Sequence, residues 1–344
     1  MTTWSVVLKL GGSVNPHQLS QVERYYRDLG TRLLVLQDVS HGGAGDLESW
    51  MHQREMSDLR VCKWRFSTFL REHPALVKEH KKLPIFRRQR DSFLGRQSFL
   101  SPHVFVSAPL VLLVRQLLDK CTWAVPDYTW VLEVDAIFTG SVTSFFDRFA
   151  SDKSDLLSTN YIIADHTFWG TQLHWNQNIG DLQPAYTASR AAARIQTTDT
   201  PLPTWRCHVT GACDGRRSVR GWLFRSIMVE RISRRLLQHT AAAIAHGTAM
   251  TAEVFETTLC LRETWCSLGD WARGSVRREA NASAWHPFPS RGYRSEHYIF
   301  FPSKMGTVSR ACLTTPNTWY HPVLELKCRE GDERCRSRVT VKTC

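Results

Sequence analysis

The stretch Thr129–Asp135 reads TWVLEVD and is the part of the sequence that decides the fold. Its first four residues form an unbroken apolar, β-rich run, which is typical of a strand covered on both faces. Glu133 and Asp135 end this run. Residues two apart on a strand point to the same side, so both carboxylates are expected to address one centre while Val134 turns back into the protein.

The position of these two acids predicts a cation or phosphate site, because ligands of open α/β sheets bind beyond the carboxyl ends of the strands. Hard cations such as Mn2+ and Mg2+ take oxygen ligands, commonly one or two carboxylates together with substrate phosphates. A nucleotide-sugar diphosphate meets that need, since the metal neutralises the charge that develops as the diphosphate leaves. Glu133 and Asp135 are therefore predicted metal ligands, and Asp135 is also a predicted catalytic residue.

A β-α-β unit is predicted at the start of the chain. Val6–Leu10 reads as a strand, Gly11-Gly12 as a turn, the segment near His17–Leu29 as a helix, and Leu33–Gln37 as a second strand. A further helix is predicted at about Ala108–Lys120. Strands and helices that alternate in this way are typical of an α/β fold.

The segment Trp130–Gly140, WVLEVDAIFTG, resembles the metal-site strand of a eukaryotic glycosyltransferase-like family with a GT-A fold. Later segments are similar to further parts of that family, in the same order. They are a helix and strand at Phe145-Phe146 and Ser154–Tyr161, an acceptor-side helix at Val229–Leu237, a Glu-Val-Phe motif within Thr251–Cys260, and a closing His-Pro-Val within Trp319–Val323. Together these pieces cover roughly residues 125–325.

This resemblance implies a Rossmann-like GT-A fold, a three-layer α/β/α sandwich around a mostly parallel sheet. It implies one domain over residues 1–325, with a nucleotide-binding part at 1–125 and a metal-site and acceptor part at 126–325. A Cys-rich, basic tail follows at 326–344. The implied activity is the metal-assisted transfer of a sugar from a nucleotide-diphosphate donor to a glycan or glycoprotein acceptor, in the Golgi lumen.

Further candidate residues lie in the later segments. Arg231 and Arg235 are spaced to lie near one another on a helix, where they meet a donor phosphate or face the solvent. The helix is predicted from apolar residues at helical spacing, namely Phe224, Ile227, Met228, Ile232 and Leu236. Glu253 is a candidate base for the acceptor hydroxyl, or a glutamate favoured by a helix N-terminus. His321 is a candidate third metal ligand or a structural histidine, and the resemblance adds Gly140 as a donor contact.

The charge of the chain favours polyanionic partners. A net charge of +12 arises from 44 Lys and Arg against 32 Asp and Glu. Basic residues cluster within 78–96 and 216–235, but no zinc-finger, homeodomain or RNA-binding signature is present, so nucleic acid is not an expected partner. Apolar residues at 42% and charged residues at 22% exclude a disordered or fibrous chain.

Ten cysteines make an even count that favours an oxidised protein. Three pairs have the spacing of small disulfide loops rather than of zinc knuckles: Cys207 and Cys213, Cys260 and Cys266, Cys328 and Cys335. Buried thiols are the alternative for Cys121 and Cys260. Asn281 begins a glycosylation sequon. No signal peptide or membrane span is visible, so a secretory route requires an N-terminal anchor that is missing from this sequence.

Two alternatives remain from other classes of function. Val6–Ser13, VVLKLGGS, resembles the phosphate-binding strand and loop of amino-acid kinases, with Lys9, Gly11, Gly12 and Ser13 around the phosphate. In the favoured interpretation these residues are the first strand and turn of the nucleotide-binding part, and Lys9→Ala is expected to leave the Mn2+-dependent difference in nucleotide binding intact. The second alternative is a catalytically inactive, carbohydrate-binding relative. Val134 in the middle of the acid triplet favours it, and Leu324 stands where the family resemblance predicts a lysine.

Overall fold

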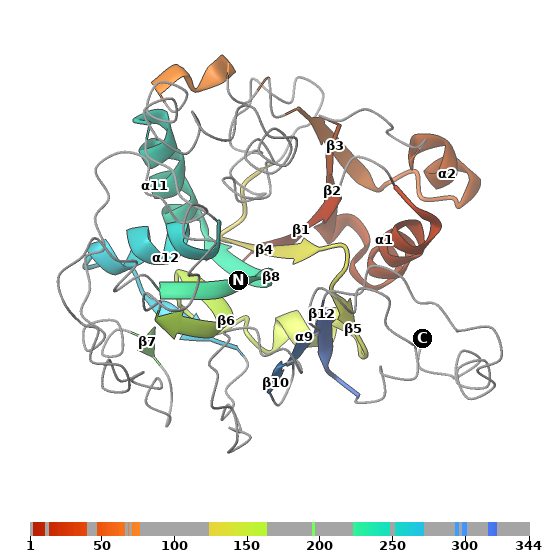
Figure 1. The fold of residues 1–344 in the computed structure, drawn as a ribbon. Coiled ribbons are helices and arrows are strands. Elements are labelled where there is room, and N and C mark those ends of the chain that lie inside the picture. Colours follow the sequence, from red (N-terminus) through yellow and green to blue (C-terminus); the bar gives the residue numbers. More distant parts are fainter. Residues whose placement is uncertain are drawn as a thin grey trace, which may run out of the picture.

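A central eight-stranded sheet organises the chain, in the order β3-β2-β1-β4-β8-β6-β9-β7 (Figure 1). The structure is a computed structural model, which describes residues 3–10, 14–39, 47–65, 68, 71–75, 124–163, 195–196, 223–247, 252–271, 293–295, 298–300 and 316–321. The strands are β1 (Trp4–Leu10), β2 (Leu33–Asp38), β3 (Arg60–Trp64), β4 (Tyr128–Glu133), β6 (Leu156–Ile163), β7 (Ile195–Gln196), β8 (Leu223–Ser233) and β9 (Leu268–Asp270).

Every strand of this sheet except β8 runs in one direction. β1 is parallel to β2 and β4, β2 to β3, and β9 to β6 and β7. β8 is antiparallel to both of its neighbours, β4 and β6. The predicted Rossmann-like α/β class with a mostly parallel sheet is therefore confirmed. The strands predicted at Val6–Leu10, Leu33–Gln37 and Thr129–Leu132 are β1, β2 and β4, whereas the helix predicted at 108–120 lies outside the described residues.

One face of the sheet is covered by α1 (Pro16–Leu29), α2 (Leu47–Gln53) and α9 (Val142–Asp147). Asn15 and Gln18 form a capping box that fixes where α1 begins, and the 3-10 turn η1 (Gly30–Arg32) leads from α1 into β2. Trp130 of β4 stacks on Phe146 of α9 with ring centroids 4.5 Å apart. This packing fixes the strand that leads to Glu133.

The helices α11 (Arg234–Ala245) and α12 (Ala252–Arg262) lie on the opposite side of the sheet from α1 and α9 (Figure 1). The Ser233 hydroxyl accepts a hydrogen bond from the Leu236 amide and so caps α11. α12 packs against β8 and buries Phe255 and Glu256 completely. In the structure Cys260 and Cys266 form a disulfide between α12 and the turn before β9.

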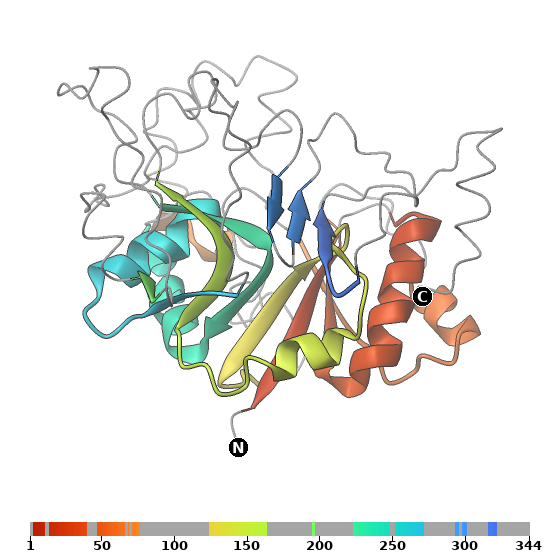
Figure 2. The ribbon, with the colours of Figure 1, turned by 90° about the horizontal axis from the view of Figure 1, so that it is seen from below.

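A second, four-stranded sheet meets the central one at the end of β4. Its order is β10 (Tyr293–Ser295), β11 (Tyr298–Phe300), β12 (Trp319–His321) and β5 (Ile137–Phe138). β5 follows β4 after one turn and pairs antiparallel with β12. Figure 2 shows these strands beside the end of β4. A segment from late in the chain therefore borders the loop that carries Asp135.

The prediction of a helix from Phe224 to Leu236 is wrong for the residues up to Ser233, because they belong to the long strand β8. β8 has buried side chains on both faces, so its apolar residues do not alternate and their spacing imitates a helical stripe. Its β-branched residues Ile227, Val229 and Ile232 favour the strand. The helix begins only at Arg234, after the Ser233 cap.

Candidate functional site

The carboxyl ends of β1 and β4 meet where the strand order of the sheet reverses. From β1 the chain proceeds outward through β2 to β3, and β4 then returns to the other side of β1. Open α/β sheets bind their ligands beyond the strand ends at such a reversal. Lys9 and Glu133 are register partners across this pair of strands, and Glu133 is the last residue of β4.

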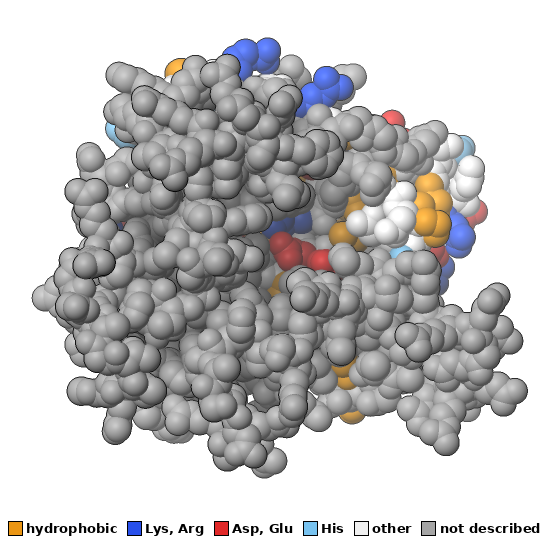
Figure 3. Space-filling model, viewed as in Figure 1, with side chains coloured by type: hydrophobic (Ala, Val, Ile, Leu, Met, Phe, Trp, Pro, Cys, Tyr) orange, Lys and Arg blue, Asp and Glu red, His pale blue; other side chains and the backbone are white. Residues whose placement is uncertain are grey.

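Lys9 and Glu133 form a partly buried ion pair at this point. Lys9 Nζ lies 2.9 Å from Glu133 Oε1, and their side chains are 11% and 20% exposed. Figure 3 shows acidic and basic side chains together near the centre of the molecular face, where Figure 1 places the carboxyl end of β4. Lys9, which the favoured interpretation placed in the nucleotide-binding part without a role at the metal site, is therefore ion-paired with one of the two predicted acids.

Asp135 lies in a turn rather than on the strand. The Ala136 amide donates a hydrogen bond of 3.0 Å to the Glu133 carbonyl, so the strand ends at Glu133. The prediction that alternation along one strand aligns Glu133 with Asp135 is wrong for that reason. Two side chains of α1 hold the turn in place. The Tyr25 hydroxyl donates a hydrogen bond to the Ala136 carbonyl, and the Arg24 guanidinium donates one to the Phe138 carbonyl.

The charge of Asp135 acts on this brace. Complete burial is the main cause that raises the pKa of Tyr25 far above its usual range, Arg24 opposes the rise, and Asp135 adds to it. Tyr25 therefore remains a neutral hydrogen-bond donor beneath the turn at any physiological pH. Asp135 is held at a defined place beyond the end of β4, even though it is not part of the strand.

The backbone of His321 reaches the same turn. In the pairing of β12 with β5, Tyr320 is opposite Ile137, so the next residue, His321, stands beside Ala136. The structure thus brings together the segments that carry Glu133, Asp135 and His321, although β12 is far away in the sequence. Of His321 only the backbone is described.

A buried cluster of charges lies on the same side of the sheet as Lys9. Arg225 Nε lies 2.7 Å from Glu230 Oε2, and Arg225 Nη2 lies 2.8 Å from Glu256 Oε2 on α12. All three side chains are at most 2% exposed. Glu230 is opposite Val131, so it shares the sheet face of Glu133. The cluster thus joins the candidate site to α12.

Burial is the main cause that raises the pKa of Glu230 from 4.5 to about 7; Glu256 adds to the rise, while Arg225 and then Lys9 oppose it. The same two carboxylates hold the pKa of Arg225 above its usual range despite its burial. Sequence reasoning missed all three residues of this cluster. The available signal was charged residues inside the apolar run of β8, which burial makes costly unless they are paired.

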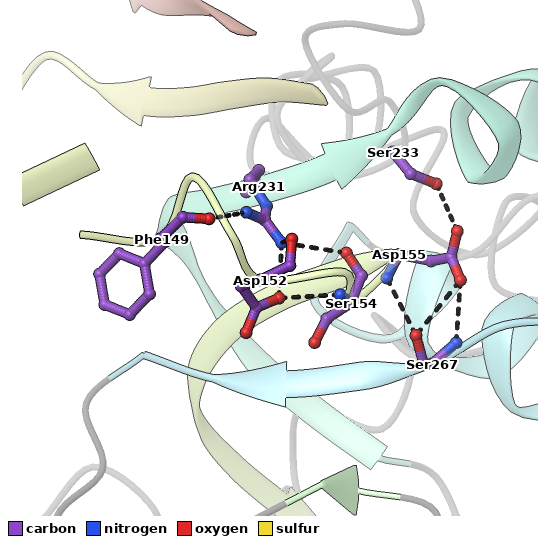
Figure 4. A network of polar contacts seen from close by, with 7 residues as sticks. All are labelled: Phe149, Asp152, Ser154, Asp155, Arg231, Ser233 and Ser267. Carbon is purple, nitrogen blue, oxygen red and sulfur yellow. Dashed lines mark hydrogen bonds and ion pairs between the residues drawn. The ribbon is translucent and has the colours of Figure 1, made fainter. Parts of the chain in front are cut away.

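Arg231 and Arg235 are not brought to the carboxyl end of β4. Arg231 pairs with Trp130 and points to the opposite face, where its guanidinium donates to Asp152 Oδ1 at 2.7 Å and to the Phe149 and Ser154 carbonyls (Figure 4). Arg235, on α11, lies over the Trp265 ring at 3.9 Å from its centroid. The two arginines therefore make separate contacts on different elements, and the helical spacing that linked them to one phosphate does not exist.

The remaining predicted residues have simpler surroundings. Gly140 lies just past β5, and a Cβ there would approach Phe138 Cε1 within 2.9 Å and would overlap the Asn317 side chain. Close packing thus accounts for this glycine. Glu253 is in the first turn of α12, where a carboxylate is favoured by the helix dipole, and only its backbone is described.

Glu133 does not fit a divalent cation in this arrangement. A cation bound to the same carboxylate would stand about 4 Å from the Lys9 ammonium group and would be opposed by about 4 kcal/mol per unit of its charge at an effective dielectric of about 20. Within the described ranges, no group of three His, Cys, Asp or Glu residues is placed to hold a metal ion. The residues present fit a site in which Lys9, not a metal, neutralises Glu133.

No helix in the described part of the chain has the length and apolar character to cross a membrane.

No protein-family model matches the sequence, and no curated protein matches it. The disulfide-bonded residues in the described part are Cys62, Cys260 and Cys266.

Several solved structures are distantly similar to this chain. A putative glucose-1-phosphate thymidylyltransferase from Bacillus anthracis in complex with a sucrose is 9% identical, covers 78% of this chain and 87% of its own, and gives a TM-score of 0.34. Galactosyltransferase LgtC in complex with donor and acceptor sugar analogs is 12% identical over 67% of this chain and 57% of its own, with a TM-score of 0.29. Core-mannan synthase A from Aspergillus fumigatus, in its Mn/GDP form, is 10% identical over 87% and 76%, with a TM-score of 0.34. Likenesses this distant assign no residue and no activity to this chain.

Proposed function

We propose that this chain is a glycosyltransferase that moves a sugar from a nucleotide-diphosphate donor to a glycan or glycoprotein acceptor. The observation that carries the proposal is the Lys9–Glu133 ion pair at the strand-order reversal, with the Asp135 turn beside it. A site with a lysine and acids beyond the ends of parallel strands suits a phosphorylated ligand. The resemblance of residues 125–325 to a glycosyltransferase-like family names the class of that ligand.

The proposed reaction breaks the bond between the anomeric carbon and the diphosphate and forms a bond from that carbon to an acceptor oxygen. The acceptor hydroxyl loses its proton to a base, for which Glu253 remains the candidate. α12, which carries Glu253 in its first turn, is anchored to β8 by the buried Arg225–Glu256 pair. The helix is therefore rigidly placed relative to the sheet, as a general base requires.

Mn2+ or Mg2+ is part of the function implied by the resemblance, with Glu133, Asp135 and His321 as ligands. Because Glu133 is ion-paired with Lys9, a metal-dependent version of the proposal retains Asp135 and His321 as the residues that would hold the cation. The cation would supply the positive charge that the leaving diphosphate requires. Binding with and without a chelator separates this version from one in which Lys9 acts alone.

The test of the proposed function is a thermal-shift panel of UDP, GDP, CMP and ATP, each with Mn2+ and with a chelator. We expect UDP or GDP to raise the melting temperature, because a ligand of the native state adds about 2.7 kcal/mol at about 100 times its Kd. Stabilisation by ATP alone would support the kinase-like alternative instead. Stabilisation by oligosaccharides but by no nucleotide would support the inactive carbohydrate-binding relative.

An oxidising compartment is part of the proposal. Cys260 and Cys266 form a disulfide, and Cys62 is also disulfide-bonded. Disulfides persist in secreted and Golgi proteins, whereas cytosolic thiols stay reduced. The sequon at Asn281 acquires a meaning only in such a compartment. The Golgi lumen is therefore the compartment that we include in the proposal.

A further inference from the structure

We propose that Lys9 is the cation of the donor site: its ammonium group binds the donor diphosphate in place of the divalent metal that the resemblance implies. This inference rests on the proposed function and specifies which positive charge serves it. It follows from the disagreement between the metal-site resemblance and the contacts that the structure gives to Glu133.

The position of Lys9 supports this role. It precedes the last residue of β1, faces Glu133 across the strand pair, and so stands at the strand-order reversal where a phosphorylated ligand binds. Its side chain is 11% exposed, so most of its stem is buried and the ammonium group is restrained rather than free in solvent. A restrained charge loses little entropy when it binds an anion.

Glu133 has a different role in this arrangement. Its carboxylate lies 2.9 Å from Lys9 Nζ and orients the ammonium group in a partly buried place. In the family resemblance the same position belongs to an acid that binds metal. Here Glu133 is a positioning residue for Lys9, and the charge that faces the diphosphate belongs to the lysine.

The buried charges nearby are paired with one another. Arg225 is already shared between Glu230 and Glu256, so it is committed to those two carboxylates. Burial shifts Glu230 toward its neutral form, which limits the negative charge that faces an incoming anion. Among these residues Lys9 is the cation at the strand ends.

The experiment measures the affinity of the full chain for UDP and GDP by calorimetry, in chelator and in Mn2+. We expect the affinity of the bound nucleotide to differ by less than about 3-fold between the two conditions. Lys9→Met is expected to weaken diphosphate binding by at least about 10-fold, the value of a hydrogen bond to a charged group. Lys9→Arg keeps the charge and is expected to restore most of the affinity.

UMP and GMP separate diphosphate binding from a structural role, because they lack the second phosphate. Lys9→Met should change their affinity by less than about 3-fold if the lysine acts on the diphosphate. Lys63→Met is the matched control. Lys63 also pairs with a glutamate near the end of a parallel strand, Glu48 at 2.7 Å, but it is 41% exposed and points to the opposite face of the sheet.

Each outcome separates the inference from the proposed function. Diphosphate binding that requires Mn2+ and is unchanged in Lys9→Met would overturn the inference and leave the transferase standing. No binding of any nucleoside diphosphate in either condition would overturn the proposed function itself. If Lys9→Met does not fold, the pair Lys9→Met with Glu133→Gln removes both partly buried charges together. Binding of UDP or GDP by this double variant at the wild-type affinity would equally overturn the inference.

Discussion

Replacing Arg225 by methionine is expected to lower the free energy of unfolding by about 3–5 kcal/mol at about pH 8. The guanidinium is the partner of Glu230 and Glu256, and all three side chains are buried. Without it, two carboxylates remain in a place that water does not reach, and an unpaired buried charge is among the most destabilising changes known. Urea denaturation followed by tryptophan fluorescence measures the effect.

The cost of Arg225→Met is expected to shrink at about pH 5, because Glu230, whose pKa burial raises to about 7, is then protonated and no longer leaves an unpaired buried charge. Arg27→Met is the control: its ion pair with Glu23 lies on the surface, where Arg27 is 75% exposed, and surface pairs contribute at most about 1 kcal/mol. An equal loss of stability for Arg225→Met and Arg27→Met would mean that the cluster is hydrated and carries no buried charge.

Glu230 also gives the wild-type protein a pH dependence with a definite sign. Its pKa is raised from 4.5 to about 7 on folding, so the native state binds more protons than the unfolded chain in that interval. The Glu230 contribution to stability is therefore full below about pH 4.5 and is lost as the pH rises through about 7. In Glu230→Gln the free energy of unfolding should fall less steeply over this range, as urea titrations at several pH values would show.

Asp135→Ala is expected to lower the rate of sugar transfer by about 100-fold or more, with no change of more than about 0.5 kcal/mol in stability. The turn carries Asp135 past the end of β4, while Glu133 is occupied by Lys9, so under the proposed function Asp135 is the acid that positions the donor. The backbone of the turn is held by hydrogen bonds from Arg24 to the Phe138 carbonyl and from Tyr25 to the Ala136 carbonyl, and the substitution leaves both intact. Turnover of UDP- and GDP-sugars and thermal melts measure the two quantities.

Asp147→Ala is the matched control for Asp135, because Asp147 is 55% exposed and its ion pair with Arg32 in the described part of the chain is a long contact of 3.9 Å. It should transfer sugar at the wild-type rate. If Asp135→Ala retained full turnover, the acid triplet would have no catalytic part, and the carbohydrate-binding alternative would gain support.

The core of the fold could be predicted from sequence because its strands are short, apolar and bounded by turns or caps. β1, β2 and β4 occur where hydrophobic runs indicated them, and α1 begins at the Asn15 cap. β8 could not be recognised in this way. Its two buried faces remove the alternation that marks a strand, and its buried charges are stabilised only by partners on other elements, such as Glu256.

The end of the strand β4 was predicted in place, but the surroundings of the two acids there were not. Glu133 and Asp135 are at the end of the predicted strand, yet the turn that separates them depends on a hydrogen bond from Ala136 that no spacing rule indicates. The Lys9–Glu133 contact depends on which strand neighbours β1, and this is a property of the whole sheet. Sequence distance hid the pair, since Lys9 and Glu133 are 124 residues apart.

The pairing of β5 with β12 has a consequence for the order in which the molecule is made. The ribosome releases β1, β4 and the Asp135 turn long before it releases residues 319–321, which complete the small sheet beside that turn. N-terminal parts of a chain fold first during synthesis. A nascent or truncated chain that ends before β12 would therefore hold its Lys9–Glu133 pair while one border of the turn stayed open, so that the turn is bordered on this side only once β12 has emerged.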